Sequence, residues 1–125
     1  MIIGIGVDLV EVARIKEMMK HHGRRFITRV FTEGEAAYCR EMKRAEEHYA
    51  ARFAAKEAAL KALGIGMRKG IAWTDIEVYL TDLGQPMVRL TGGAGDHADE
   101  LGVNHVFLSL SHTKEYAVAQ VVMEA

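Results

Sequence analysis

The sequence predicts a single α+β domain that spans residues 1–125. Of these residues, 50% are hydrophobic and 26% are charged, a composition that can bury a modest core. Strand-like apolar runs and helical patterns follow one another along the chain, and no repeat, low-complexity tract or linker separates them. We therefore expect one folded unit rather than several domains.

The first third of the chain predicts a strand followed by two helices. The apolar run at 2–8 predicts a strand, and apolar residues at helical spacing predict a helix over 11–22. Thr32 followed by Glu35 matches a capping box, which opens a helix that ends near Cys39.

The middle and the end of the chain predict one long helix and two pairs of strands. The long alanine-rich helix covers about 46–63 and ends at Gly64, after which Gly66 and Gly70 predict a flexible loop. The remaining expected elements are strands at 76–80 and 87–90 joined by a turn at DLGQP, a short helix at 96–101, and strands at 106–110 and 116–123.

Charge and cysteine content exclude several classes of function. A net charge of -1 predicts no general attraction to nucleic acid or membrane, so only clustered charges, such as the basic residues between Arg14 and Arg29, can steer a partner. The single Cys39 excludes an internal disulfide and a cysteine-based zinc site, and it fits a reducing compartment. Because no apolar stretch is long enough to span a bilayer and an acid occurs within the first eight residues, we expect no signal peptide or anchor and a cytoplasmic location.

The long helix carries the first candidate site residues, Glu57 and Lys61. They lie one helical turn apart in an alanine-rich run and therefore share one face. A carboxylate at the edge of a buried surface needs a cation to offset its desolvation, and Lys61 or a metal ion could supply it. The alternative is an ordinary surface pair, worth about 0.3 to 0.5 kcal/mol.

Asp8 is the second candidate. In a strand over 2–8 it points to the same side as Gly4 and Gly6, where missing side chains leave room for a ligand or a close-packed helix. That position suits a metal ligand. Asp8 and Glu11 also match a helix-capping pattern, and the spacing alone does not choose between the two roles.

The motif SLSHT near the end of the chain is a poor match to a serine hydrolase. Neighbours in a strand point to opposite faces, so Ser111 and His112 cannot readily pair, and no G-x-S-x-G elbow is present. His112 at a strand end is either a ligand for substrate or phosphate, or a turn residue. The loops GIGMRKG and TGGAG could approach phosphate through backbone amides, but neither matches the phosphate-loop motif.

Four segments together resemble a known family. GVDLVEVARI, FTEGEAAYC, RFAAKEAALKALG and HVFLSLSHTKEYAVAQVV occur in the order found in holo-acyl-carrier-protein synthases, the small bacterial type of 4'-phosphopantetheinyl transferase. The resemblance covers nearly the whole chain. Its most specific part is ARFAAKEAALKALG preceded by an early G-x-D, and the LGQP hairpin agrees with it.

The resemblance implies a fold, a reaction and an assembly. It implies a small antiparallel sheet packed against a long helix, in homotrimers with sites between neighbouring subunits. The enzyme would move 4'-phosphopantetheine from coenzyme A to a serine of apo acyl carrier protein, release adenosine 3',5'-bisphosphate and require magnesium. The family's metal ligands fall on Asp8 and Glu57, which favours the functional role for both.

The resemblance also assigns roles to further residues. Lys61 would stabilise charge on the leaving phosphate, while Glu57 or a metal-bound water would take the serine proton. The coenzyme A site would comprise Arg52, Lys43, Arg44, Gly66, Ser111 and His112, with Arg52, Lys43 and Arg44 as candidates for the 3'-phosphate.

The partner would be an acidic carrier protein. Arg14 with Met18, and Arg25 with Phe26, offer cations beside apolar contacts along the first helix and its exit. The alternative is a solvated basic face with no partner.

Two other classes of function use part of the same features. A magnesium-dependent nucleotide hydrolase would need a water-positioning base besides Glu57, and none stands out in the sequence. A noncatalytic module that binds the carrier would have no reason to keep Asp8, Glu57 and Lys61 together.

Overall fold

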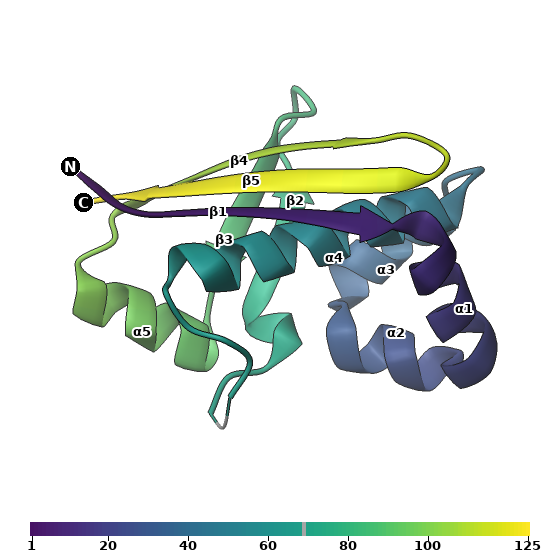
Figure 1. Ribbon diagram of the computed structural model, residues 1–125, viewed down its shortest axis with the longest axis horizontal. Coiled ribbons are helices and arrows are strands. Elements are labelled where there is room, and N and C mark those ends of the chain that lie inside the picture. The colour runs from purple at the N-terminus through teal and green to yellow at the C-terminus, as the bar shows by residue number, and fades with distance from the viewer. Residues whose placement is uncertain (69) are drawn as a thin grey trace.

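The computed structural model describes residues 1–68 and 70–125 (Figure 1). The α-helices are α1 (Val12–His22), α2 (Arg24–Val30), α3 (Glu33–Arg40), α4 (Ala45–Ala62) and α5 (Gly92–Leu101), with a short 3-10 helix at Trp73–Asp75. The strands are β1 (Ile2–Glu11), β2 (Ile76–Leu80), β3 (Pro86–Leu90), β4 (His105–His112) and β5 (Tyr116–Glu124).

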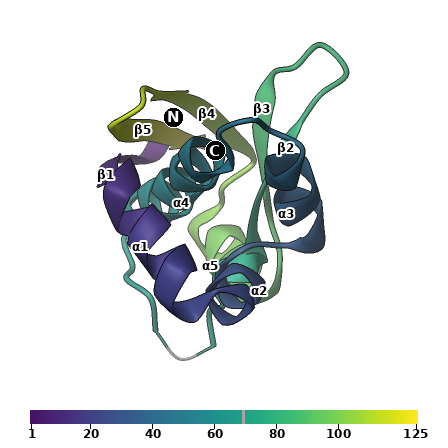
Figure 2. The same ribbon diagram turned by 90° about the vertical axis from the view of Figure 1, so that its right-hand side faces the viewer.

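A three-stranded antiparallel sheet lies over the long helix α4. The strand order is β1-β5-β4, so the first strand pairs with the last and brings the two chain ends together. Strands β2 and β3 form a separate antiparallel hairpin next to β4, and the tip of this hairpin projects from the body of the molecule (Figure 2). The expected α+β fold with a small antiparallel sheet and a long helix is confirmed.

Two glycines let β1 approach α4 closely. A Cβ built on Gly6 would lie 1.8 Å from the carbonyl oxygen of Ala58, and one on Gly4 would lie equally close to that of Ala62. Any side chain there would push the strand off the helix. The space left by the glycines is therefore filled by the helix, and Asp8, the next inward-facing residue of the strand, is brought against the same helix.

The structure differs from the expected elements at several boundaries. β1 continues to Glu11, and a separate helix α2 follows Gly23, whose φ of 52° breaks the chain direction after α1. α5 begins at Gly92 rather than at Asp96, because the Asp75 carboxylate accepts a hydrogen bond from Ala94 N at the start of that helix. The TGGAG segment therefore forms the start of a helix, held by the Asp75 side chain, rather than a loop.

Other local predictions are confirmed. Thr32 and Glu35 form the expected capping box at α3, where each side chain accepts from the other's backbone N–H. Gly64 follows the end of α4 with a φ of 74°, a conformation that favours glycine.

The outer face of the three-stranded sheet exposes large apolar side chains. The exposed residues are Ile5, Val7 and Leu9 of β1, Phe107 of β4, and Tyr116 and Val118 of β5. The opposite face of the sheet packs on α4 and forms the core. A contiguous apolar face of this kind is typical of a surface that another protein covers.

Candidate active site

Asp8, Glu57 and Lys61 come together where β1 crosses the end of α4. Lys61 Nζ donates to Asp8 Oδ1 at 3.1 Å and to the Val7 carbonyl oxygen at 2.9 Å. Lys61 of α4 therefore pairs with Asp8 of β1, and the alternative of an ordinary surface pair between Glu57 and Lys61 is not the contact that forms. A residue from the first strand and two residues from a helix far along the chain thus share one site.

Asp8 does not cap the following helix. β1 runs three residues past Asp8, and the N-cap of α1 is Glu11, whose side chain makes no capping hydrogen bond to the described part of the chain. The capping alternative for Asp8 is therefore wrong, because the strand carries on past the aspartate before the helix starts. The Asp8 side chain is 16% exposed and faces α4.

The electrostatics of this site leave an excess of negative charge. Burial, and then the nearby Asp8 carboxylate, raise the pKa of Glu57, while Lys61 opposes them. The single positive charge of Lys61 does not balance the two partly buried carboxylates of Asp8 and Glu57. A bound cation would relieve this excess.

The donor set fits magnesium better than a transition metal. Within residues 1–68 and 70–125, no group of three or more His, Cys, Asp or Glu side chains is arranged to hold a metal ion. Magnesium is commonly held by one or two carboxylates plus waters and substrate phosphates, which matches the pair Asp8 and Glu57.

A second cluster is centred on a buried arginine. Arg52 on α4 is 4% exposed, and its guanidinium lies 4.2 Å from the centre of the Tyr38 ring. Among the residues that the structure describes, Arg52 takes part in no ion pair, and its buried Nε has no hydrogen-bond partner. A buried cation without an acid is costly unless a ligand anion neutralises it.

The cavity beside Arg52 collects further residues of the expected coenzyme A site. Its volume is about 270 Å³. It is lined by Tyr38, His48, Ala51, Arg52, Val78, Leu80, Gly84, Pro86, Leu110 and His112. His112 Nδ1 lies 3.0 Å from Glu47 Oε1, and the His48 ring packs 4.7 Å from the His112 ring. Sequence reasoning found Arg52 and His112 but missed Tyr38, Glu47 and His48, which only the fold brings to them.

The other expected coenzyme A residues are less closely gathered. Lys43 and Arg44 are exposed in the turn before α4, with Arg44 Nη1 3.7 Å from Glu47 Oε2. Gly66 lies after α4, where an added Cβ would meet none of the described atoms within 4 Å. Ser111 points to the outer face of the sheet while His112 points inward, so the expectation that the two cannot pair is confirmed.

The two clusters lie on opposite edges of the sheet. Asp8 is on β1 and His112 is on β4, with β5 between them. Adjacent strands are about 4.8 Å apart, so two strand spacings, together with the helix beneath the sheet, separate the carboxylate pair from the arginine cavity within one chain.

The expected carrier-protein residues line or border a third hollow. Arg14 and Arg25 are exposed, and Met18 is 41% exposed on α1. Met18, Arg25 and Phe26 line a hollow of about 460 Å³, although Phe26 itself is mostly buried. Phe53 and Trp73 also line it, with their ring centres 5.2 Å apart, and sequence reasoning missed both because neither lies near the first helix in the chain.

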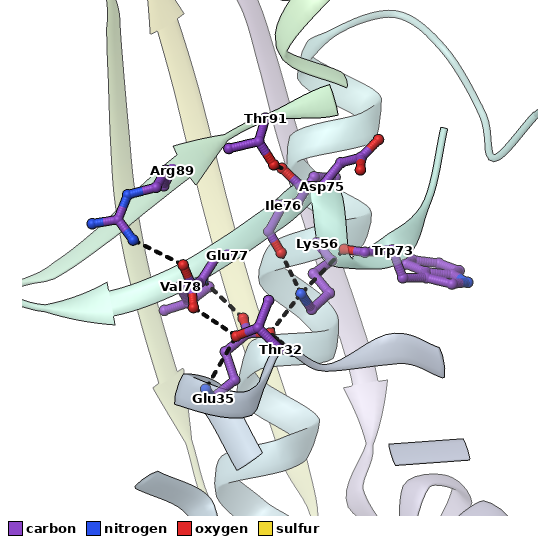
Figure 3. A network of polar contacts seen from close by, with 10 residues as sticks. All are labelled: Thr32, Glu35, Lys56, Trp73, Asp75, Ile76, Glu77, Val78, Arg89 and Thr91. Atoms are coloured by element: carbon purple, nitrogen blue, oxygen red, sulfur yellow. Dashed lines mark hydrogen bonds and ion pairs between the residues drawn. The ribbon is translucent and has the colours of Figure 1, made fainter. Parts of the chain in front are cut away.

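A buried ion pair fixes the helix that carries Glu57. Lys56 Nζ lies 2.8 Å from Glu35 Oε1, and both side chains are fully buried. Lys56 also donates to the carbonyl oxygens of Trp73 and Ile76 (Figure 3). Burial lowers the pKa of Lys56, and Glu35 opposes that effect. Because Lys56 directly precedes Glu57, these contacts to α3 and β2 fix the rotation of α4 at the site.

The Glu35 carboxylate is satisfied on both oxygens. It accepts from Lys56 on one oxygen and from the backbone N–H of Val78 at 2.8 Å on the other (Figure 3). Sequence reasoning assigned Glu35 only to the capping box, because the partner lysine lies in a helix and β2 lies further still along the chain.

The fold thus places a carboxylate pair and a buried arginine on one scaffold of sheet and long helix. The profile of the 4'-phosphopantetheinyl transferase superfamily matches residues 4–121. The chain belongs to that superfamily.

Known proteins resemble this chain in sequence and in structure over nearly its full length. It is 48% identical over 124 residues to the holo-[acyl-carrier-protein] synthase of Koribacter versatilis, covering 99% of each chain. The crystal structure of the Neisseria meningitidis synthase superposes with a TM-score of 0.91 at 34% identity, covering 100% of both chains. A Bacillus anthracis synthase in complex with CoA (3',5'-ADP) superposes with a TM-score of 0.83 at 41% identity, covering 100% of this chain and 98% of the other.

Proposed function

We propose that this chain transfers the 4'-phosphopantetheine group from coenzyme A to a serine of apo acyl carrier protein, giving holo carrier protein and adenosine 3',5'-bisphosphate. The observation that carries this function is the convergence of Asp8, Glu57 and Lys61 at one point of the fold. The names of the full-length relatives and the nucleotide bound to the Bacillus anthracis synthase support the same reaction.

Asp8 and Glu57 would hold the magnesium ion, whose charge would neutralise phosphate oxygens of coenzyme A. The serine oxygen attacks the phosphorus that carries pantetheine, and the P–O bond to the nucleotide phosphate breaks. Lys61 stabilises the charge that develops on the leaving phosphate. Glu57, or a water molecule held at the carboxylate pair, would take the serine proton.

The arginine cavity is the candidate site for the nucleotide part of coenzyme A. Arg52 has no acidic partner among the described residues, so the 3'-phosphate would supply its missing anion. His112 lines the same cavity and would add a contact to the nucleotide. Lys43 and Arg44, exposed in the turn before α4, would add charge-assisted contacts. Gly66 and Ser111 remain candidates for this site on the family resemblance alone.

We further propose that the active unit is a homotrimer with its sites between subunits. The exposed apolar face of β1, β5 and β4 supports association. The separation of the carboxylate pair from the arginine cavity supports a shared site, because β1 of one subunit beside β4 of a neighbour would unite the two clusters.

A mixing experiment tests the shared site. Asp8→Ala keeps the arginine cavity, and Arg52→Ala keeps the carboxylate pair, so each variant alone should be nearly inactive. After unfolding and refolding together, the mixture should regain activity, since some interfaces then combine two intact halves. Activity that stays at the level of the separate variants would contradict a site built from two subunits.

The remaining proposals concern the carrier and the cell compartment. Arg14, Met18, Arg25 and Phe26 form the candidate docking surface for an acidic carrier protein. Among the residues described, no helix has the length and apolar character needed to cross a membrane. The free, buried Cys39 fits a reducing compartment, and we place the reaction in the cytoplasm.

One incubation separates the proposed transfer from its two alternatives. The protein is mixed with coenzyme A, magnesium and apo carrier protein, and the carrier is weighed by mass spectrometry while coenzyme A is followed by chromatography. Transfer adds one phosphopantetheine mass to the carrier. Loss of coenzyme A with an unchanged carrier would indicate a nucleotide hydrolase, and no change in either would indicate a binding module.

A further inference from the structure

Glu47 is a buried acid to which the proposed transfer reaction assigns no role. It lies in the first turn of α4, where the helix N-terminus stabilises negative charge. Its side chain is 7% exposed. Oε1 lies 3.0 Å from His112 Nδ1, and Oε2 lies 3.7 Å from Arg44 Nη1. The carboxylate therefore holds two residues expected to bind the nucleotide.

These contacts constrain the His112 ring from two sides. Glu47 accepts from Nδ1, and the His48 ring packs against the imidazole at 4.7 Å. Burial, with the neighbouring His112 and Arg52, lowers the pKa of His48, so His48 serves as a neutral packing surface. With Nδ1 held, Nε2 is the ring nitrogen left for a ligand, and His112 lines the cavity that contains Arg52.

A carboxylate beside an anion site would normally repel the anion. Glu47 avoids this because both of its oxygens face cationic or proton-donating partners. Its carboxylate also fixes the orientation of the His112 ring, as a carboxylate does for a histidine that it holds through Nδ1.

We propose that Glu47 is a positioning residue for the 3'-phosphate of coenzyme A, which it serves by holding the His112 ring so that Nε2 faces that phosphate. The inference rests on the proposed function, because it takes the arginine cavity as the nucleotide site. It adds a residue that acts through His112 and that touches no ligand itself. A purely structural tether between α4 and β4 would instead affect all nucleotides alike.

Binding of two nucleotides that differ by one phosphate tests this proposal. Titration calorimetry gives the Kd of adenosine 3',5'-bisphosphate and of adenosine 5'-monophosphate for the wild-type protein and for Glu47→Gln. Loss of one charge-assisted contact should raise the Kd of the bisphosphate about tenfold and leave that of the monophosphate unchanged. Glu46→Gln, the same change one residue earlier in the same helical turn, is the matched control and should alter neither Kd.

A double variant separates positioning from direct contact. Because Glu47 acts through His112, Glu47→Gln combined with His112→Ala should bind the bisphosphate no more weakly than His112→Ala alone. Additive losses in the double variant would overturn the proposal. Equal weakening of both nucleotides by Glu47→Gln would also overturn it and leave a structural tether.

Two outcomes distinguish this proposal from the proposed function. If the wild-type protein binds the bisphosphate and His112→Ala keeps the full preference for it over the monophosphate, the positioning role is wrong while the nucleotide site stands. The His112→Ala measurement would test the positioning role of Glu47 even if Glu47→Gln failed to fold. A wild-type protein that binds neither nucleotide would contradict the nucleotide site itself.

Discussion

At the scale of single residues, Glu57 combines its proposed role as a metal ligand with an electrostatic cost. Burial and the Asp8 carboxylate disfavour its charged form, and Lys61 compensates only in part. Functional sites commonly hold ionisable groups in such unfavourable settings, because the ligand supplies the missing charge.

This cost predicts how stability depends on pH. Because folding raises the pKa of Glu57, the wild-type chain is stabilised at low pH and loses that stabilisation as pH rises through the folded-state pKa. Glu57→Gln has no charge to bury. In metal-free buffer at acid pH, the variant and the wild type should therefore have nearly the same free energy of unfolding. Toward neutral pH the variant should become the more stable of the two. Urea denaturation at several pH values measures this difference.

Magnesium should make the wild type more stable than Glu57→Gln at neutral pH. Added to both proteins at neutral pH, it should raise the stability of the wild type and leave Glu57→Gln nearly unchanged, because the amide is a poor substitute for a ligating carboxylate. A wild-type protein that is more stable than the variant in metal-free buffer at neutral pH would contradict a raised pKa for Glu57.

Lys61 yields a prediction about turnover rather than affinity. Its ammonium group is exposed and paired with Asp8, so it can move toward charge that develops at the leaving phosphate. Lys61→Met should lower kcat by about 10²-fold, the usual cost of removing one group that stabilises transition-state charge, with little change in the KM for coenzyme A. Steady-state kinetics at saturating carrier measures both constants. An effect confined to KM would reassign Lys61 to substrate binding.

At the scale of elements, the sequence predicted the helices and strands that have strong local patterns. The long helix, the capping box at Thr32 and the hairpin of β2 and β3 all carry their signals within a few residues. α2 was missed because Gly23 and the basic residues around it read as a helix exit rather than as a second helix. The early start of α5 depends on Asp75, which lies outside that helix.

Of the candidate site residues, those in short local motifs could be predicted from the sequence, and those paired only by the fold could not. Asp8, Glu57, Arg52 and His112 were found because short motifs contain them. Glu47 and the buried pair of Lys56 with Glu35 were not found, since each partner lies in a different element and only the fold brings them together. The pairing of Lys61 with Asp8 likewise needed the close contact of β1 with α4, which two glycines permit.

The exposed side of α1 predicts how the carrier is recognised. Arg14 is an exposed cation of α1, and Met18 of the same helix lines the hollow that also contains Arg25 and Phe26. Arg14→Glu should raise the KM for carrier protein about tenfold or more, leave coenzyme A binding unchanged and reduce the loss of activity with salt.

Kinetics at several ionic strengths test this docking surface. Lys16→Glu changes charge equally at another exposed position of α1 and serves as a control for net charge alone. If Arg14→Glu and Lys16→Glu alter the KM for carrier by the same factor, the effect is general electrostatics and the docking surface lies elsewhere on the protein.

At the scale of the whole molecule, the fold distributes the proposed chemistry over two edges of one sheet. The carboxylate pair lies at β1, the arginine cavity lies beside β4, and the apolar outer face of the sheet lies between them. In the proposed homotrimer, neighbouring copies would each supply part of one site.

The central claim is that Asp8 and Glu57 together support magnesium-dependent transfer of phosphopantetheine to a carrier serine. The most direct measurement is the mass of apo carrier protein after incubation with coenzyme A, magnesium and either wild-type protein or Asp8→Ala, with circular dichroism showing that both are folded. The wild type should add one phosphopantetheine mass only when magnesium is present, and Asp8→Ala should leave the carrier unchanged. A folded Asp8→Ala variant that modifies the carrier at the wild-type rate at limiting magnesium would contradict the account.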